Sequence, residues 1–369
     1  MFGKLIIDKT ETPIRWRGSR VRSAALLCGL LLGICAPGLA QTFVTFDAPD
    51  ARTGEDRGTL GQSINLRGEV TGYFWDANDV VHGFVRNPGG RLTEFDAPGA
   101  STRFDRGTVP LSINRSGAVA GYYNDNDYLP HGFLRAANGT LTTFDAPGSV
   151  KGTSPTAIND AGAITGSYAD ARSVEHGFLR APDGTFTTFD APGAGTAFQQ
   201  GTTVRSINSA GAITGYYYDA NYVHHGFVRA PDGTITSFDA PGAGTGLDQG
   251  TFAFSINTAG KVTGAYSDAG YLVHGYVRAP DGTFTTIDAG TNGIVALSIN
   301  DAGAITGYVG GFPNHGFLQA PDGTFTTFDA PGVDVGQQST DPMSINGRGE
   351  VTGNYQDSSA SVHGFLRRP

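Results

Sequence analysis

Three short motifs recur seven times each along this chain of 369 residues, and no other feature of the sequence limits the possible fold as strongly. The Ser-Ile-Asn motif has its asparagine at Asn65, Asn114, Asn159, Asn208, Asn257, Asn300 and Asn346. The His-Gly-Phe motif has its histidine at His82, His131, His176, His225, His274, His315 and His363. The Phe-Asp-Ala-Pro motif has its aspartate at Asp47, Asp96, Asp145, Asp190, Asp239, Asp288 and Asp329. Successive copies are 41 to 49 residues apart, a spacing that predicts an array of similar structural units.

One repeat, residues 202–242, predicts four short strands. The first strand ends at Asn208, and a Ser-Ala-Gly turn follows, where asparagine and glycine tolerate a left-handed backbone. The second strand, AITGYYYD, is rich in β-branched and aromatic residues. The third, HGFVRA, is joined by a Pro-Asp-Gly turn to the fourth, TITSFDAP. Glycine accounts for 55 of the 369 residues, which favours frequent turns, and no amphipathic helix of ten or more residues is expected.

The two ends of residues 41–369 lie at different points of the repeat. Residues 42–49 (TFVTFDAP) form a fourth strand without its first three, and residues 363–369 (HGFLRRP) form a third strand without its fourth. An open array would leave both strand edges unpaired, whereas a ring pairs them. The sequence therefore predicts a single all-β domain, a seven-bladed β-propeller of four-stranded antiparallel blades, closed by the N-terminal strand pairing with the last blade. We expect Ser-Ile-Asn nearest the axis and Phe-Asp-Ala-Pro outermost.

Residues 1–40 have the pattern of a secretory signal peptide. Four arginines precede a twelve-residue apolar run, Ala24 to Cys35, which is shorter than the roughly 20 residues that a membrane-spanning helix needs. Gly38-Leu39-Ala40 presents small residues where a leader peptidase cleaves, so we expect a mature chain that starts at Gln41. The protein would then be secreted, periplasmic or on the cell surface. The alternative is a lipoprotein acylated at Cys35, although Ile34 is bulkier than such sites favour.

Composition narrows the possible partners and chemistry. Both cysteines, Cys28 and Cys35, lie in the leader, so the mature chain would have no disulfide, thiolate nucleophile or cysteine metal ligand. Residues 41–369 contain 19 Lys and Arg against 32 Asp and Glu, a net charge of −13, and their only lysines are Lys151 and Lys261. A chain this acidic is repelled by phosphates, which argues against nucleic acid as a partner. No later apolar stretch is long enough to span a membrane.

The motifs resemble the repeats of a family of bacterial extracellular proteins named for its His-Ala-Phe motif (the HAF repeat). The resemblance covers residues 42–369, with glycine in place of the alanine in all seven copies and Tyr276 in place of the phenylalanine in one. It implies an exported, β-rich repeat protein. It implies no catalytic residue, because the family is identified by its repeat and not by a known chemistry.

The repeated histidines and aspartates are expected to be structural. One histidine per blade would lie on a wide ring, whereas a metal site needs three or four ligands at one point. We expect each imidazole to hydrogen-bond the Ser-Ile-Asn serine or the repeated aspartate, because buried polar groups must be paired. The aspartates themselves are expected to accept backbone N–H bonds that shape their loop. His224, the one histidine outside the motif, is expected to be solvated.

No cofactor is expected, because none of the usual catalytic or phosphate-binding motifs occurs. Residues 76–79 (DAND) and 125–127 (DND) have an oxygen-rich spacing that could hold calcium. Both lack the glycine and the downstream glutamate of a dedicated calcium loop.

A ligand site is expected on the rim where the repeat is least regular. That rim carries the connections between the second and third strands and between blades, with the most variable segments at residues 50–62, 100–111, 199–205, 248–254 and 334–343. Trp75, Tyr128, Tyr222 and Tyr271 would add aromatic faces there, which are suited to stacking on sugar rings. The alternative is that these rings pack between blades.

Two functions from different classes follow. The favoured one is a monomeric, non-catalytic extracellular binding module for a glycan, another surface protein or the cell envelope, because seven equivalent copies offer no asymmetric catalytic group. The second is an exported hydrolase or lyase with its active site at the channel mouth. It would require carboxylates such as Glu55, Asp56 and Asp105 to converge.

Overall fold

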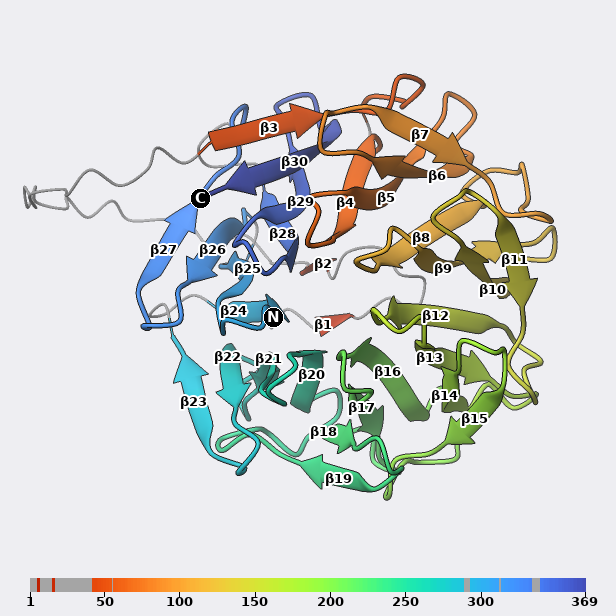
Figure 1. Ribbon diagram of the computed structural model, residues 1–369. Helices are drawn as coiled ribbons and strands as arrows, with labels where there is room; N and C mark the ends of the chain where they lie inside the picture. The colour runs from red at the N-terminus through yellow and green to blue at the C-terminus, as the bar shows by residue number, and fades with distance from the viewer. Residues whose placement is uncertain are drawn as a thin grey trace, which may run out of the picture.

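The chain folds into a ring of seven four-stranded β-sheets around a central axis (Figure 1). The computed structural model describes residues 5–6, 15–16, 42–54, 56–288, 293–311, 313–333 and 339–369, and all regular structure within them is β-strand. The prediction of an all-β, seven-bladed propeller is confirmed. The proposed signal peptide lies outside the described residues, apart from the paired strands β1 (Leu5–Ile6) and β2 (Arg15–Trp16). Among the described residues, no helix is long and apolar enough to cross a membrane.

The four strands of each blade occupy four concentric positions, with Ser-Ile-Asn innermost and Phe-Asp-Ala-Pro outermost, as predicted (Figure 1). The innermost strands are β4 (Thr59–Ile64), β8 (Thr108–Ile113), β12 (Thr153–Ile158), β16 (Gly201–Ile207), β20 (Gly250–Ile256), β24 (Ile294–Ile299) and β28 (Thr340–Ile345). The second strands are β5 (Val70–Trp75), β9 (Val119–Asn124), β13 (Ile164–Ala169), β17 (Ile213–Tyr218), β21 (Val262–Ser267), β25 (Ile305–Val309) and β29 (Val351–Gln356). The third strands are β6 (Val81–Arg86), β10 (Pro130–Arg135), β14 (Glu175–Arg180), β18 (His224–Arg229), β22 (Val273–Arg278), β26 (His315–Gln319) and β30 (Val362–Arg368). The outermost strands are β7 (Leu92–Phe95), β11 (Leu141–Phe144), β15 (Phe186–Phe189), β19 (Ile235–Phe238), β23 (Phe284–Ile287), β27 (Phe325–Phe328) and β3 (Thr42–Phe46).

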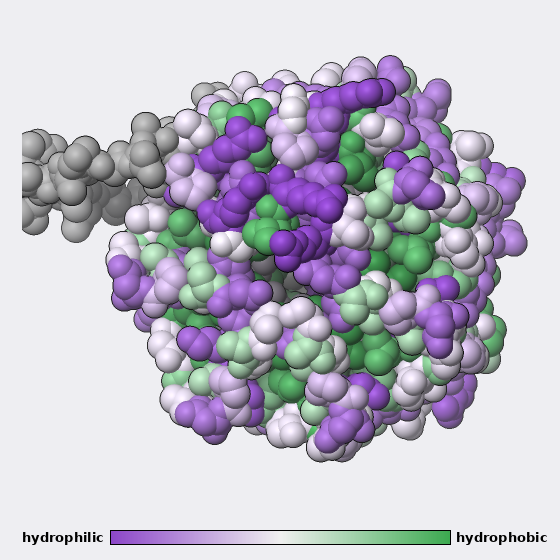
Figure 2. Space-filling model, viewed as in Figure 1, coloured by the Kyte–Doolittle hydropathy of each residue, from purple (hydrophilic) through white to green (hydrophobic). Residues whose placement is uncertain are grey.

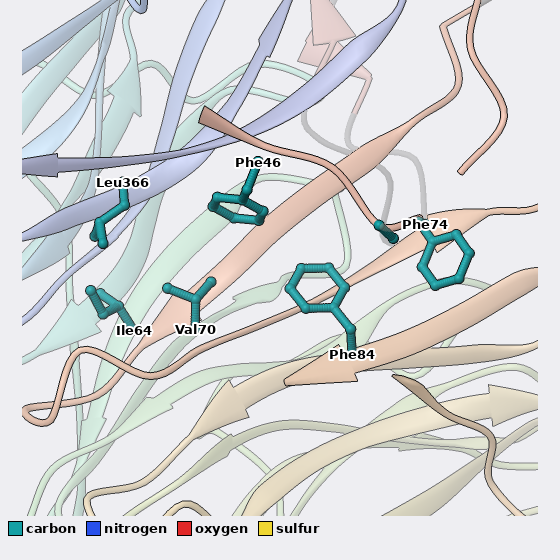
Figure 3. Packing of buried hydrophobic residues seen from close by; sticks show 7 residues of the cluster. Phe46, Ile64, Val70, Phe74, Phe84 and Leu366 are labelled. Atoms are coloured by element: carbon teal, nitrogen blue, oxygen red, sulfur yellow. The ribbon is translucent and has the colours of Figure 1, made fainter. Parts of the chain in front are cut away.

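Blades 1 to 6 follow the chain order from β4–β7 to β24–β27, and blade 7 combines β28–β30 with β3. Strand β3 runs antiparallel to β30, with Thr42 opposite Arg368 and Phe46 opposite Gly364. The predicted ring closure by the N-terminal strand is therefore confirmed. In Figure 3, Phe46 and Leu366 of blade 7 pack against Ile64 and Phe84 of blade 1, so closure also buries apolar surface between these blades.

Neighbouring blades touch at the start of each innermost strand. Glu175 pairs with Gly201, and His224 pairs with Gly250, each by one parallel bridge, so blades 3, 4 and 5 form one continuous sheet. Gly107 approaches Val81 of blade 1 in the same way, at a φ of 141°. A Cβ on Gly107 would lie 1.9 Å from the Val81 carbonyl oxygen, so only glycine permits this approach.

The seven Ser-Ile-Asn asparagines form a closed ring of hydrogen bonds around the axis. Each side-chain Nδ2 donates to the backbone carbonyl of the next motif's asparagine at 2.9–3.2 Å. The last bond runs from Asn346 to the carbonyl of Asn65 and joins blade 7 to blade 1. The motif's serines add a second set, because Ser63 Oγ accepts the Ile113 amide of the next blade at 3.3 Å. Blade 3 has Ala157 in place of the serine.

A third contact between blades pairs arginine with phenylalanine. Six third-strand arginines place their guanidinium groups 4.7–5.0 Å from the ring of the outermost-strand phenylalanine in the preceding blade. At the seventh interface both positions differ, because Gln319 replaces the arginine and Ile287 replaces the phenylalanine. The two positions therefore change together within one sequence, as expected for a cation–π pair.

Figure 2 shows the face of the ring seen in Figure 1. Hydrophilic residues gather on it over β28, β29 and β4, beside the axis. Blade 7, which contains the closure seam, and blade 1 thus carry the most hydrophilic part of this face.

Candidate functional site

The repeated histidines contact carboxylates of their own blade on one or both ring nitrogens. The imidazole Nδ1 lies 2.8–3.1 Å from the Phe-Asp-Ala-Pro aspartate in six blades. The imidazole Nε2 lies 3.2–3.8 Å from an aspartate in the preceding loop, namely Asp76, Asp125, Asp170, Asp219, Asp268 or Asp357. The imidazole also stacks on a second-strand ring, such as Tyr217 on His225 with centroids 5.0 Å apart. The expected pairing with the repeated aspartate is therefore observed.

These contacts raise the pKa of three of the histidines, and hydrogen bonds lower the pKa of the loop aspartates. The hydrogen bond to Asp47 raises the pKa of His363, outweighing the effect of burial, and His82 and His225 are raised in the same way by Asp96 and Asp239. Burial alone would raise the pKa of Asp357, but hydrogen bonds from Ser359, Ser361 and His363 lower it to about 2.

Three expectations about these polar groups are wrong. The motif serine does not pair with histidine in the described blades; its hydroxyl accepts the isoleucine amide of the next blade. The repeated aspartate is held by histidine, whereas the neighbouring alanine amide donates to a threonine, as Ala97 does to Thr108 at 2.9 Å. His224 is not solvated: it is 2% exposed, its ring lies 3.9 Å from that of Phe252, and its Nδ1 lies 3.1 Å from the Gln249 carbonyl oxygen.

The predicted arrangement of the connections on one rim is borne out by contacts between loops. The Asp105 amide, in the connection entering blade 2, donates to Asp79 in the β5–β6 loop at 2.7 Å. The Gln199 amide donates in the same way to Ser173 at 3.0 Å. A cavity of about 360 Å³ opens between the connections of blades 1 to 4.

Aromatic residues form much of the cavity wall. Blades 1 and 2 contribute Tyr73, Trp75, Tyr122 and Tyr128. Blades 3 and 4 contribute Tyr168, Phe198, Tyr216 and Tyr218. Hydroxyl and amide groups from Asn124, Ser154, Thr156, Ser167, Gln199 and Thr203 lie among them. Aromatic walls with scattered polar groups are typical of small-ligand sites.

The cavity exists because blade 3 departs from the repeat in two ways. The residue after the second-strand glycine is tyrosine in blades 1, 2, 4 and 6, but Ser167 in blade 3. The connection that enters blade 3 is also four residues shorter: the alanine–threonine hydrogen bond spans 7 positions at Ala146–Thr153 but 11 at Ala97–Thr108. A small side chain and a short loop therefore leave space between the large residues of blades 2 and 4.

The four aromatic residues proposed from the sequence lie in different surroundings. The expectation of an exposed Trp75 is wrong, because its ring is 4% exposed, donates from Nε1 to Asp105 at 3.0 Å and lies under the Arg57 guanidinium. It still lines the cavity, as does Tyr128, which is 40% exposed. Tyr222 and Tyr271 lie outside the cavity lining.

The three tyrosines share one structural role. Each has a positive φ of 60–70° in the loop between second and third strands. Their hydroxyls donate to the backbone carbonyls of Asp105, Phe198 and Leu247 in the connection entering the same blade. They therefore fix the position of the neighbouring connection.

These connections present large apolar side chains to solvent. Phe104, Phe198 and Leu247 occupy equivalent positions, each three residues before the glycine at the start of an innermost strand. Their exposed fractions are 64%, 61% and 54%. Phe198 lines the cavity, so its ring lies at the cavity edge with most of its surface exposed. Phe198 was not among the residues predicted from the sequence, although it directly precedes the variable segment 199–205.

Four charged side chains line the cavity, and the two acidic ones differ from the two basic ones in their contacts. Asp105 pairs with Arg57 at 3.2 Å in addition to Trp75. Glu175 accepts a hydrogen bond of 2.6 Å from the Thr203 hydroxyl. Lys151 and Arg205 also line the cavity, and within the described part of the chain neither forms an ion pair; Arg205 lies 5.8 Å from the Phe254 ring.

Burial, followed by the nearby Tyr216, Asp248 and Glu175, raises the pKa of Tyr218 far above its usual range. The phenol therefore stays protonated at any physiological pH and can serve as a hydrogen-bond donor beside the cavity.

The carboxylates proposed for a catalytic site are not brought together in the cavity. Glu55 lies outside the described residues, and Asp56 is outside the cavity lining and accepts a hydrogen bond from Gln356. Among the residues that the structure describes, no group of three or more His, Cys, Asp or Glu is arranged to hold a metal ion. In the two oxygen-rich loops, Asp76 Oδ1 and Asp125 Oδ1 each accept two backbone amides, which explains the acidic residues at these turns.

A comparison with protein-family models found no match, and a comparison with curated proteins found no similar sequence. Solved structures are similar in fold. Virginiamycin B lyase from Staphylococcus aureus gives a TM-score of 0.56 at 14% identity, covering 88% of this chain and 99% of that chain. A puromycin hydrolase gives 0.54 at 12% identity, covering 84% of this chain and 51% of that one.

A prolyl endopeptidase gives a TM-score of 0.53 at 10% identity, covering 81% of this chain and 47% of that chain. The present chain thus spans about half the length of the hydrolase and the endopeptidase. Identities this low show the fold and nothing about ligand or chemistry. The comparisons therefore place the chain among β-propellers.

Proposed function

We propose that this protein is a non-catalytic, carbohydrate-binding module, whose ligand occupies the cavity over blades 1 to 4. The observation that carries the proposal is the exposed Phe198 ring at the edge of a 360 Å³ cavity with aromatic and hydroxyl-bearing walls. Sugars present an apolar ring face and many hydroxyls, so they need an aromatic surface beside hydrogen-bonding groups. Tyr128 supplies a second exposed ring, with Arg106 over one face at 4.4 Å.

The binding test is a glycan array probed with residues 41–369, followed by calorimetry on the best glycan. Phe198→Ala should weaken binding about 3- to 10-fold, the range expected for loss of one aromatic stacking contact. Leu247→Ala is the matched control, because Leu247 occupies the equivalent position in blade 5 and does not line the cavity.

A second variant tests the cavity itself. Ser167→Tyr restores the residue found in four other blades and should fill the space, weakening binding by about tenfold or more while the chain still folds. Failure to bind any glycan, or full binding by Ser167→Tyr, would contradict the proposal.

The compartment is part of the same proposal. The leader pattern of residues 1–40 and the likeness to HAF repeats both support export to the periplasm or cell surface. Expression of the full-length chain in a bacterium should yield a mature N-terminus at Gln41 outside the cytoplasm, checked by fractionation and N-terminal sequencing. An uncleaved chain retained in the cytoplasm would rule out this part of the proposal.

A further inference from the structure

The charges around the cavity point to the class of carbohydrate. Residues 41–369 carry a net charge of −13 and only two lysines, yet one of these, Lys151, lines the cavity together with Arg205. The carboxylates of the lining have partners of their own, since Asp105 pairs with Arg57 and Glu175 accepts from Thr203. Neither cation forms an ion pair with the described residues, whereas both carboxylates accept hydrogen bonds from other side chains.

Arg205 lies at a β-bulge in strand β16. Each innermost strand has a β-bulge, and the extra residues are Gln62, Leu111, Thr156, Arg205, Phe254, Leu297 and Met343. Arg205 is the one charged residue in this set. A bulge redirects a side chain out of the regular alternation of the sheet, and bulges often lie beside binding sites.

Arg205 is half-buried in the cavity wall, and its guanidinium forms no ion pair with the described residues. Four other blades place an apolar residue at this position, so the fold does not need a cation there. A ligand carboxylate would satisfy the guanidinium with two parallel hydrogen bonds, a geometry that arginine forms well.

We propose that the cavity binds an acidic oligosaccharide, with a uronic-acid carboxylate on Arg205, Lys151 assisting at the rim and a sugar ring on Phe198. This inference rests on the proposed carbohydrate binding and specifies its ligand. The negative charge of the whole chain repels polyanions at long range, so retention of an acidic sugar would depend on these two local cations.

The test compares a trigalacturonate with the matching neutral galactotriose by calorimetry on the full domain, residues 41–369. We expect trigalacturonate to bind more tightly, and Arg205→Gln to weaken it roughly 10- to 100-fold, the loss expected for one charge-assisted pair. Lys151→Gln should weaken it by a smaller factor. Lys261→Gln is the control, because it removes the other lysine of the domain from outside the cavity lining.

Each outcome decides between the two proposals. The acidic-ligand inference would be overturned, with carbohydrate binding left intact, if the neutral galactotriose bound as tightly as trigalacturonate. The same would follow if Arg205→Gln weakened the binding of both sugars equally. Binding of acidic peptides but of no sugar would overturn both. An Arg205→Gln protein with unchanged melting temperature and unchanged binding of trigalacturonate would also overturn the inference.

Discussion

At the residue scale, the repeated side chains stabilise the ring through contacts within and between blades. Histidine and aspartate join strands within a blade, whereas asparagine, serine and arginine join one blade to the next. Replacement of both members of the arginine–phenylalanine pair by Gln319 and Ile287 shows that these contacts act as pairs. Specificity is therefore left to the residues that do not repeat, such as Ser167 and Arg205.

The histidine–aspartate pairs make stability depend on pH. Because the folded pKa of His363 is raised, its contribution to stability is fully present below the unfolded pKa of about 6.5 and is lost as pH rises through the folded value. Asp357 has a lowered pKa of about 2, so its contribution is lost only as pH falls from about 4 toward 2.

We therefore expect the protein to be most stable between about pH 4 and 6.5 and to melt at a lower temperature at pH 8.5 than at pH 6. His363→Gln should cost about 1–3 kcal/mol at pH 6 and less at pH 8.5, reducing the dependence on pH. Thermal unfolding across this range measures both effects. A variant whose melting temperature depends on pH as steeply as the wild type's would show that this pair does not contribute.

At the scale of single elements, glycine lets strands of adjacent blades approach. Gly58, Gly107, Gly201 and Gly250 bring two backbones into contact, because a Cβ at these positions would lie 1.9–2.1 Å from a carbonyl oxygen of the preceding blade. Other repeated glycines lie in tight turns that face open space. Gly211 has a φ of 87°, and a Cβ added to it would have no neighbouring atom within 4 Å.

Gly107 and Gly211 should respond differently to the same substitution. Gly107→Ala combines backbone strain with a collision and should destabilise the fold by about 2–4 kcal/mol. Gly211→Ala meets strain alone and should cost about 1–2 kcal/mol. Denaturant unfolding of the two variants provides the comparison. Equal losses would mean that the contact between blades 1 and 2 relaxes without cost.

At the scale of the whole molecule, stability depends on closure. Strand β3 covers the edge of β30, and the hydrogen bond from Asn346 to Asn65 completes the ring on the inner side. On the outer side of the ring, closure leaves only the outermost strands, which are short, with an unpaired edge, and this limits pairing with other chains.

Deletion of residues 41–49 from a chain that starts at Gln41 should therefore expose β30 and cause aggregation or a large loss of thermal stability. The matched control is the intact chain from residue 41 to 369. Light scattering and melting curves measure the result. A shortened chain that stays monomeric and melts at the same temperature would show that closure by β3 is dispensable.

The sequence alone determined the number of blades, their four strands and the position of the seam. These depend on local chemistry, namely turn residues, strand propensity and the point of the repeat at which residues 42–49 begin. The order of the four strands from the axis outward was also predicted from the point of the repeat at which residues 42–49 begin. His224 shows the limit of such reasoning, because its burial against Phe252 depends on a residue 28 positions away.

Only the tertiary structure decided which repeated groups meet and where space remains. Asn65 and Asn114 are 49 residues apart, and the bond between them exists only because identical blades stand side by side. The cavity likewise needs three blades at once: Ser167 and a shortened loop create space only when the larger residues of blades 2 and 4 enclose it. Two features of the sequence correspond to this cavity: residue 167 is serine where four other repeats have tyrosine, and the spacing from Asn114 to Asn159 is shorter than that from Asn65 to Asn114. Their meaning depended on packing between units, which no single repeat specifies.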